Sequence, residues 1–118
     1  MAGTDYARAS RDRAVGIKAA QLADAIRDSL AGPIQQRCPG FIVSVTGVTL
    51  SEDKQRANVW VRTYPVEKSS DAIQALRRAQ GALQRELIRS LPRRAVPHIE
   101  LRQDTSVEAE EELSSLLR

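Results

Sequence analysis

The sequence predicts an α+β domain in which helices pack on one face of a three-stranded sheet. Three observations lead to this prediction. Two stretches with the alternation of β-strands are joined by a polar turn, a long helical stretch follows them, and a short alternating stretch follows that helix. Since a hairpin and one crossover fit a single sheet, the expected order is α-β-β-α-α-β-α. Residues 1–118 are expected to form one domain, with residues 1–7 flexible.

The first expected helix begins at Ser10, a suitable N-cap, and reaches about Leu30. Its apolar residues recur at helical spacing and form one buried stripe: Val15, Ala19, Leu22, Ile26 and Leu30. The basic residues off this stripe are expected to face solvent: Arg11, Arg13, Lys18 and Arg27. Gly32 and Pro33 are expected to end the helix, because the residue before a proline disfavours helical backbone angles.

The next two elements are predicted to form an antiparallel hairpin, with strands from Phe41 to Leu50 and from Ala57 to Tyr64. Gly47 interrupts the alternation of the first strand, which predicts a β-bulge. In the second strand, the residues of one face alternate with those of the outer face. The first set is Ala57, Val59, Val61 and Thr63. Trp60 and Tyr64 lie on that outer face, where covering the sheet is a more economical role than base stacking.

The stretch from Asp71 to Leu91 has the period of one amphipathic helix, yet Gly81 lies in its interior. Gly in a helix interior costs about 1 kcal/mol relative to Ala. A straight helix of this length would extend roughly 30 Å, which exceeds the length of a small sheet. We therefore expect two shorter helices with a break near Ala79-Gln80-Gly81, capped at the start by Ser69 or Ser70.

The last two elements are a strand from His98 to Gln103 and a helix that begins at Thr105 or Ser106. Ile99 and Leu101 are expected to point into the core, and His98 outward. If this strand runs parallel to the second one, the connection between them is expected to be a right-handed crossover.

Composition limits the classes of function. The chain has 18 Lys and Arg against 15 Asp and Glu, a net charge of +3, and 3% aromatic residues. This balance favours nucleic acid or an anionic surface as the partner. Cys38, the single cysteine, is interpreted as a filler of a loop or the core, and it indicates a reducing compartment. The cytoplasm is therefore expected, with an organelle matrix left open, and no apolar run is long enough to span a membrane.

No set of residues in the sequence could carry out catalysis. His98 is the only histidine, and it has no nucleophile or metal-binding motif around it. The glutamates from Glu108 to Glu112 are better explained as the solvated start of a helix than as a metal site. We therefore expect that the protein is not an enzyme and that it binds no metal, cofactor or small-molecule substrate. We also expect a monomer when the protein is free.

Arginines gather in and directly after the broken helix. Together with the break itself they form the candidate RNA-binding set: Arg77, Arg78, Ala79, Gln80, Gly81, Arg85, Arg89, Arg93 and Arg94. With so few aromatic residues, contact with RNA is expected to rest on arginine–phosphate pairs and on shape. From the residues alone, RNA binding and an ordinary solvated charged face remain equally open.

Three blocks of sequence, in this order and spacing, resemble one known family. They are 45–53 followed by Ala57-Asn58-Val59-Trp60-Val61, then Ala75-Leu76 followed by Ala79-Gln80-Gly81, and finally Arg94-Ala95-Val96-Pro97 with Asp104-Thr105-Ser106. On these blocks the chain, from about Arg11 to Leu117, resembles ribosome-binding factor A, the bacterial-type assembly factor of the small ribosomal subunit. The chain departs from the family at Gln36-Arg37-Cys38-Pro39-Gly40, where an Asp-Pro-Arg turn is usual.

The resemblance implies a type II KH-like fold in which an Ala-x-Gly kink, Ala79 to Gly81, replaces the usual GXXG loop. It implies binding to the immature small subunit, contact with its rRNA near the decoding region, and a role in late maturation of that rRNA. Two alternatives remain. One is a KH-like module that acts on another RNA, and the other is a protein-interaction domain that binds no RNA.

Overall fold

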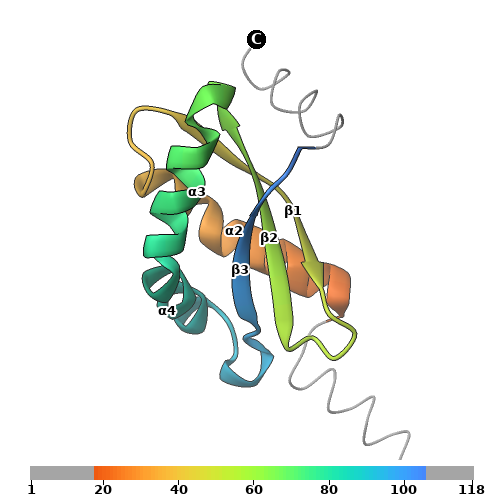
Figure 1. Ribbon diagram of the computed structural model, residues 1–118. Coiled ribbons are helices and arrows are strands. Elements are labelled where there is room, and N and C mark those ends of the chain that lie inside the picture. The colour runs from red at the N-terminus through yellow and green to blue at the C-terminus, as the bar shows by residue number, and fades with distance from the viewer. Residues whose placement is uncertain (1–17, 106–118) are drawn as a thin grey trace, which may run out of the picture.

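A three-stranded sheet forms the base of the fold in the computed structural model, which describes residues 18–105 (Figure 1). Its strands are β1 (Ile42–Leu50), β2 (Arg56–Tyr64) and β3 (His98–Gln103), in the spatial order β1-β2-β3. The hairpin β1–β2 is antiparallel and the pair β2–β3 is parallel. The predicted hairpin and the predicted third strand are therefore confirmed.

Helices α2 (Ala19–Gln36), α3 (Ser69–Arg78) and α4 (Gln80–Ser90) pack on one face of the sheet (Figure 1). The apolar side chains of this face meet those of the helices in an aliphatic core that includes Leu30, Val59, Leu76, Leu87 and Ile99, each fully buried. The strands bury alternate residues, as the sequence pattern predicted. The opposite face of the sheet is not covered by any of these helices (Figure 1).

The end of the first helix differs from the prediction. Helix α2 continues through Gly32 and Pro33 to Gln36. A proline inside a helix costs about 3 kcal/mol or more. The extra turn, however, brings Ile34 into the core with no exposed surface, and Cys38 follows it there. Burial of these two side chains offsets the local penalty, since fully burying an isoleucine contributes about 1.5–3 kcal/mol and the buried thiol adds to it.

Two details of α2 also differ from the predicted stripe. Leu22, Ile26 and Leu30 are buried as expected, whereas Ala19 is exposed because it begins the helix at the rim of the core. Arg27 is not simply solvated, because its guanidinium Nη2 donates to the carbonyl oxygen of Thr46 over 2.8 Å. Burial raises the pKa of the Cys38 thiol, in keeping with its predicted role as a core filler.

The bulge predicted at Gly47 is present in β1. The register passes from Val45 opposite Val61 to Gly47 opposite Trp60, so Thr46 has no register partner on β2. The side chain of Arg27 binds the carbonyl oxygen of Thr46, and the Thr46 hydroxyl donates to the Asp104 carboxylate at the end of β3. The bulge is thus held by residues from α2 and from the third strand.

The long amphipathic stretch is two helices, as predicted, but its start differs. A short 3-10 helix, η1 (Val66–Lys68), precedes α3, and Lys68 occupies the N-cap position without a side-chain cap. Neither Ser69 nor Ser70 is the cap, because η1 leads the chain directly into the helix and places both residues inside its first turn. A second 3-10 helix, η2 (Arg93–Ala95), connects α4 to β3.

Glutamine side chains from the helices satisfy backbone groups on the outer edges of the sheet. On β1, Gln35 of α2 donates to Phe41 O over 2.7 Å and accepts from Val43 N over 2.9 Å. On β3, Gln84 of α4 donates to Pro97 O over 2.8 Å and accepts from Ile99 N over 2.9 Å. Each helix is therefore tied to an edge strand by paired hydrogen bonds as well as by apolar packing.

Several predictions concern parts of the chain beyond residues 18–105. The N-cap at Ser10, the buried position of Val15, the solvated Arg11 and Arg13, and the final helix from Thr105 or Ser106 onward lie outside the described residues. Among the helices within 18–105, none combines the length and the apolar character needed to cross a lipid bilayer.

Candidate nucleic-acid interface

The joint between α3 and α4 is a single residue, Ala79. Its backbone angles, φ −91° and ψ 6°, fall outside the range of the flanking helices, and it caps both of them. The Ala79 N–H donates to Ala75 O over 3.0 Å, and the Ala79 carbonyl accepts from Leu83 N over 2.9 Å. Each helix therefore forms a backbone hydrogen bond with Ala79, and the helix axis changes direction at this residue (Figure 1). Ala79 is buried, so its side chain packs against the core.

Gln80 and Gln84 lie one turn apart on α4 and both reach β3. The Gln80 side-chain amide donates to the carbonyl oxygen of Ile99, and Gln84 binds the N–H of the same residue. The amide of Gln80, a candidate RNA-binding group, is thus engaged within the protein. The role of Gln84 could not be predicted from the sequence. A glutamine beside an amphipathic stripe is expected to be solvated unless the position of the edge strand is known.

Gly81 lies in the first turn of α4 and is exposed. Positive φ is not the reason for a glycine here, because Gly40 is the one glycine of the described residues with that conformation. A Cβ atom added to Gly81 would lie 3.5 Å from Arg85 Nη1, which is an ordinary contact with the end of a flexible side chain. The folded protein alone therefore tolerates a larger residue at this position.

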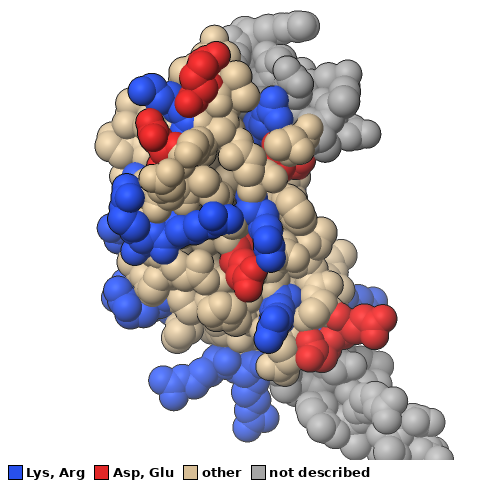
Figure 2. Space-filling model, in the orientation of Figure 1, with Lys and Arg blue, Asp and Glu red and all other residues tan. Residues whose placement is uncertain are grey.

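All six candidate arginines are exposed, and they follow the two helices in chain order. Arg77 and Arg78 end α3, Arg85 and Arg89 lie on α4, and η2 carries Arg93 and Arg94. Because α4 extends about 16 Å at 1.5 Å per residue, the set is an elongated strip and not a cluster at the joint. Figure 2 shows basic side chains gathered over α3, α4 and the segment before β3.

Few acidic groups neutralise this strip. Within residues 18–105, Arg89 is the one arginine of the six in an ion pair, with Glu86 at 3.3 Å, and that pair is exposed. An exposed pair of this kind contributes only about 0–1 kcal/mol, so Arg89 can exchange Glu86 for another anion at little loss. Asp71, the other acid within α3 and α4, pairs with Lys68 at the opposite end of α3.

Comparison with known proteins identifies the family. The family model of ribosome-binding factor A matches residues 17–117. The chain belongs to the ribosome-binding factor A family. It is 36% identical over 98 residues to ribosome-binding factor A of Moorella thermoacetica, with 82% of this chain and 78% of that protein covered. It is 38% identical over 104 residues to the Thermomicrobium roseum protein of the same name, with 84% and 80% covered.

The fold agrees with a solved structure of the ribosome-binding factor A family. The crystal structure of the Thermus thermophilus protein superposes with a TM-score of 0.64 at 29% identity, and the match covers 72% of this chain and 93% of that one. This similarity confirms the predicted KH-like α+β fold. The relatives are named as binding factors and not as enzymes. The RNA-binding roles of the individual residues stay predictions.

Proposed function

We propose that this protein is a non-catalytic ribosome assembly factor that binds the immature small ribosomal subunit and assists the late maturation of its rRNA. Membership of the ribosome-binding factor A family is the observation that carries the proposal. The protein acts as one domain, in the cytoplasm, as a monomer and without a cofactor. Its proposed rRNA contact consists of these residues: Arg77, Arg78, Ala79, Gln80, Gly81, Arg85, Arg89, Arg93 and Arg94.

The chemistry of the strip supports RNA as the partner. A guanidinium group binds a phosphate through two parallel hydrogen bonds and keeps its charge at any physiological pH. Five of the six arginines make no ion pair within residues 18–105, so their charge is available to an incoming anion. Since Gln80 is engaged with β3, the joint offers backbone and guanidinium groups and no free amide to read bases. Recognition by backbone and shape is expected to dominate.

Co-sedimentation with ribosomal particles tests this function. The full-length protein is mixed with precursor small subunits, mature small subunits and large subunits, and the bound fraction is measured at rising salt concentration. We expect preferential binding to the precursor, with a loss of affinity of about a thousandfold between about 50 and 200 mM salt if six phosphates are contacted.

Three results would contradict the proposal. Failure to co-sediment with any small-subunit particle at low salt would remove the assembly role. Selective, salt-sensitive binding to a non-ribosomal RNA would instead support a KH-like module with another target. Binding that does not change with salt would point to a protein partner.

The substitution Gly81→Ala tests whether the glycine is required for stability or for binding to the precursor subunit. Alanine is expected to raise the free energy of unfolding by about 0.5–1 kcal/mol, because it is the better helix former and its methyl group meets only Arg85. The same methyl group is expected to weaken binding to the precursor subunit, because it keeps an RNA backbone from approaching the start of α4. Urea unfolding and co-sedimentation measure the two effects. Ala82→Gly, one residue further along α4, serves as a control that is expected to lower stability and leave binding unchanged.

A further inference from the structure

The sheet face opposite α2, α3 and α4 carries aromatic, amide and guanidinium groups, of which Arg62 is buried. The outward side of β2 presents Trp60 between Asn58 and Arg62, and the outward side of β3 presents Arg102 next to Trp60 in the strand register. Arg102 and Arg56 are exposed, and Trp60 and Asn58 are partly exposed. None of these residues belongs to the arginine strip on α3, α4 and η2.

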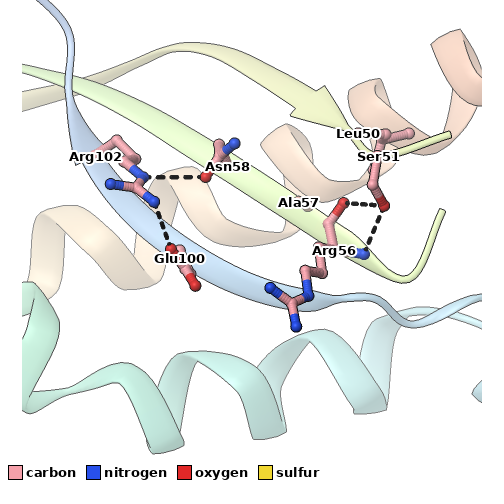
Figure 3. Close-up of a pocket in the computed structure, with 7 residues that line it drawn as sticks. All are labelled: Leu50, Ser51, Arg56, Ala57, Asn58, Glu100 and Arg102. Atoms are coloured by element: carbon pink, nitrogen blue, oxygen red, sulfur yellow. Dashed lines mark hydrogen bonds and ion pairs between the residues drawn. The ribbon is translucent and has the colours of Figure 1, made fainter. Parts of the chain in front are cut away.

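Arg102 is held in a fixed orientation on this face. Its Nε donates to Asn58 Oδ1 over 3.1 Å, and its Nη2 donates to Glu100 Oε2 over 2.8 Å (Figure 3). The Arg102 side chain remains 47% exposed. A guanidinium group that is already oriented loses little side-chain entropy when a phosphate binds to its remaining N–H groups.

Trp60 is similarly fixed beside Arg102. Its indole Nε1 donates to Thr49 Oγ1 on β1 over 3.0 Å. Its register partner on β1 is Gly47, and a Cβ atom placed on Gly47 would meet nothing within 4 Å. The bulge therefore places no side chain of β1 directly opposite the indole. Trp60 is an oriented and partly exposed ring.

A hollow of about 260 Å³ lies next to Arg102 and Asn58, and Trp60 is not among the residues that line it. Arg102, Glu100 and Asn58 line one side of it, and Arg56 and Ser51 line the other (Figure 3). At about 30 Å³ for each water molecule, it holds the equivalent of eight or nine waters, which is sufficient for one nucleobase. The side chains around it are mainly polar, with a guanidinium group on each side.

We propose that the sheet face opposite α2, α3 and α4 binds a short single-stranded segment of RNA, with one base stacked on Trp60, a neighbouring base in the hollow, and Arg102 and Arg56 on phosphates of the segment. An oriented aromatic ring beside a groove that carries cations is the arrangement that binds single strands. Of the residues that line the hollow, Arg56 and Arg102 are cations and Glu100 is the anion, so the lining is net positive. The identity of the RNA as rRNA rests on the proposed function, whereas binding of a single strand to this face does not.

Trp60 is the only tryptophan of the chain, so its fluorescence reports on this face directly. The full-length protein is titrated with an oligouridylate of about eight nucleotides, a length within the usual site size of single-strand binders. We expect saturable quenching that weakens as salt rises. Arg102→Gln is expected to lower the affinity by about tenfold or more, since it removes one charge-assisted contact. Arg37→Gln, an equal change of charge at the end of α2, is the matched control and is expected to leave the affinity unchanged.

Three further variants place the contact. With a labelled oligonucleotide, Trp60→Phe should retain most of the affinity, because a ring remains, while Trp60→Thr should lower it by about tenfold or more. The double variant Arg85→Glu with Arg89→Glu should still show quenching, since it alters only the other surface. Urea unfolding of each variant confirms that it is folded, and Arg102→Gln, at an exposed position, carries the test if Trp60→Thr fails to fold.

The proposal is overturned by any of three results. The first is the absence of quenching in the unmodified protein, which leaves the co-sedimentation test of the proposed function unaffected. The second is an equal affinity in Arg102→Gln and Arg37→Gln. The third is a change of Trp60 emission with RNA-free small-subunit proteins and none with the oligonucleotide, which would assign this face to a protein.

Discussion

Replacing Arg85 and Arg89 together by glutamate is expected to lower the affinity for the precursor small subunit by about two orders of magnitude. Each substitution removes a cation from α4 and adds an anion where a phosphate is proposed to lie, and one charge-assisted hydrogen bond contributes about 1.5–3 kcal/mol. The slope of binding against salt concentration should also become shallower by about two phosphate contacts. Co-sedimentation over a range of salt concentrations measures both quantities.

The double substitution should leave the domain folded. Both side chains are exposed, and only the exposed pair between Arg89 and Glu86 is lost. A new anion near the end of α4 opposes the helix dipole, at a cost of about 0.3–1 kcal/mol. Arg37→Glu with Lys54→Glu changes the net charge equally at positions outside the strip. If this control lost as much affinity, the attraction would be a property of the total charge and α4 would not be the contact surface.

Gln84→Leu is expected to lower the free energy of unfolding by about 2–4 kcal/mol, an unusually large effect for a polar residue on an outer helix. Leucine has a similar volume, so packing is nearly preserved, but Ile99 N–H and Pro97 O both lose their partner. Ile99 and Pro97 are buried, and water cannot replace the lost hydrogen bonds without opening the structure. Each buried unsatisfied backbone group costs about 1–3 kcal/mol. Urea unfolding followed by circular dichroism measures the change.

Gln74→Leu is the matched control for this substitution. Gln74 lies on α3 at an exposed position, where it donates only to Ser70 Oγ over 3.2 Å. The change should alter stability by less than about 0.5 kcal/mol. A second variant, Gln84→Glu, retains the acceptor for Ile99 N–H but loses the donor to Pro97 O, and should fall between the two. Equal stability of Gln84→Leu and Gln74→Leu would show that the edge of β3 finds other partners.

The strands and the helix joint could be predicted from sequence because their signals are local. Alternation in β1 and β2, Gly47 at the bulge, and the change at Ala79 to Gly81 all depend on neighbouring residues. The end of α2 could not be predicted in this way. Gly32 and Pro33 give a strong local stop signal, and the helix passes it only because Ile34 and Cys38 find room in a core that other segments build. The predicted start of α3 was wrong for a similar reason. The short helix η1 follows the end of β2 and leads directly into α3, so neither serine acts as the cap.

The candidate site, like the fold, could be predicted from sequence only where its signals are local. Arginines off an apolar stripe are exposed in any amphipathic helix, so the strip on α3 and α4 follows from periodicity. The engagement of Gln80 with Ile99 depends on where β3 lies relative to α4, which no local pattern contains. Trp60 and Arg102 are 42 positions apart in the chain. Their register across β2 and β3 appears only once the crossover has formed.

The glutamine side chains on the two edge strands also affect how copies of the protein meet one another. Unpaired N–H and C=O groups at the edge of a sheet are a template for a strand of another molecule, and many proteins protect that edge with charged residues or proline. Here Gln35 occupies the backbone between Phe41 and Val43, and Gln84 occupies it between Pro97 and Ile99. The glutamine side chains of the helices therefore oppose the addition of a strand from another molecule at both edges. Protection of these edges does not depend on arginine side chains.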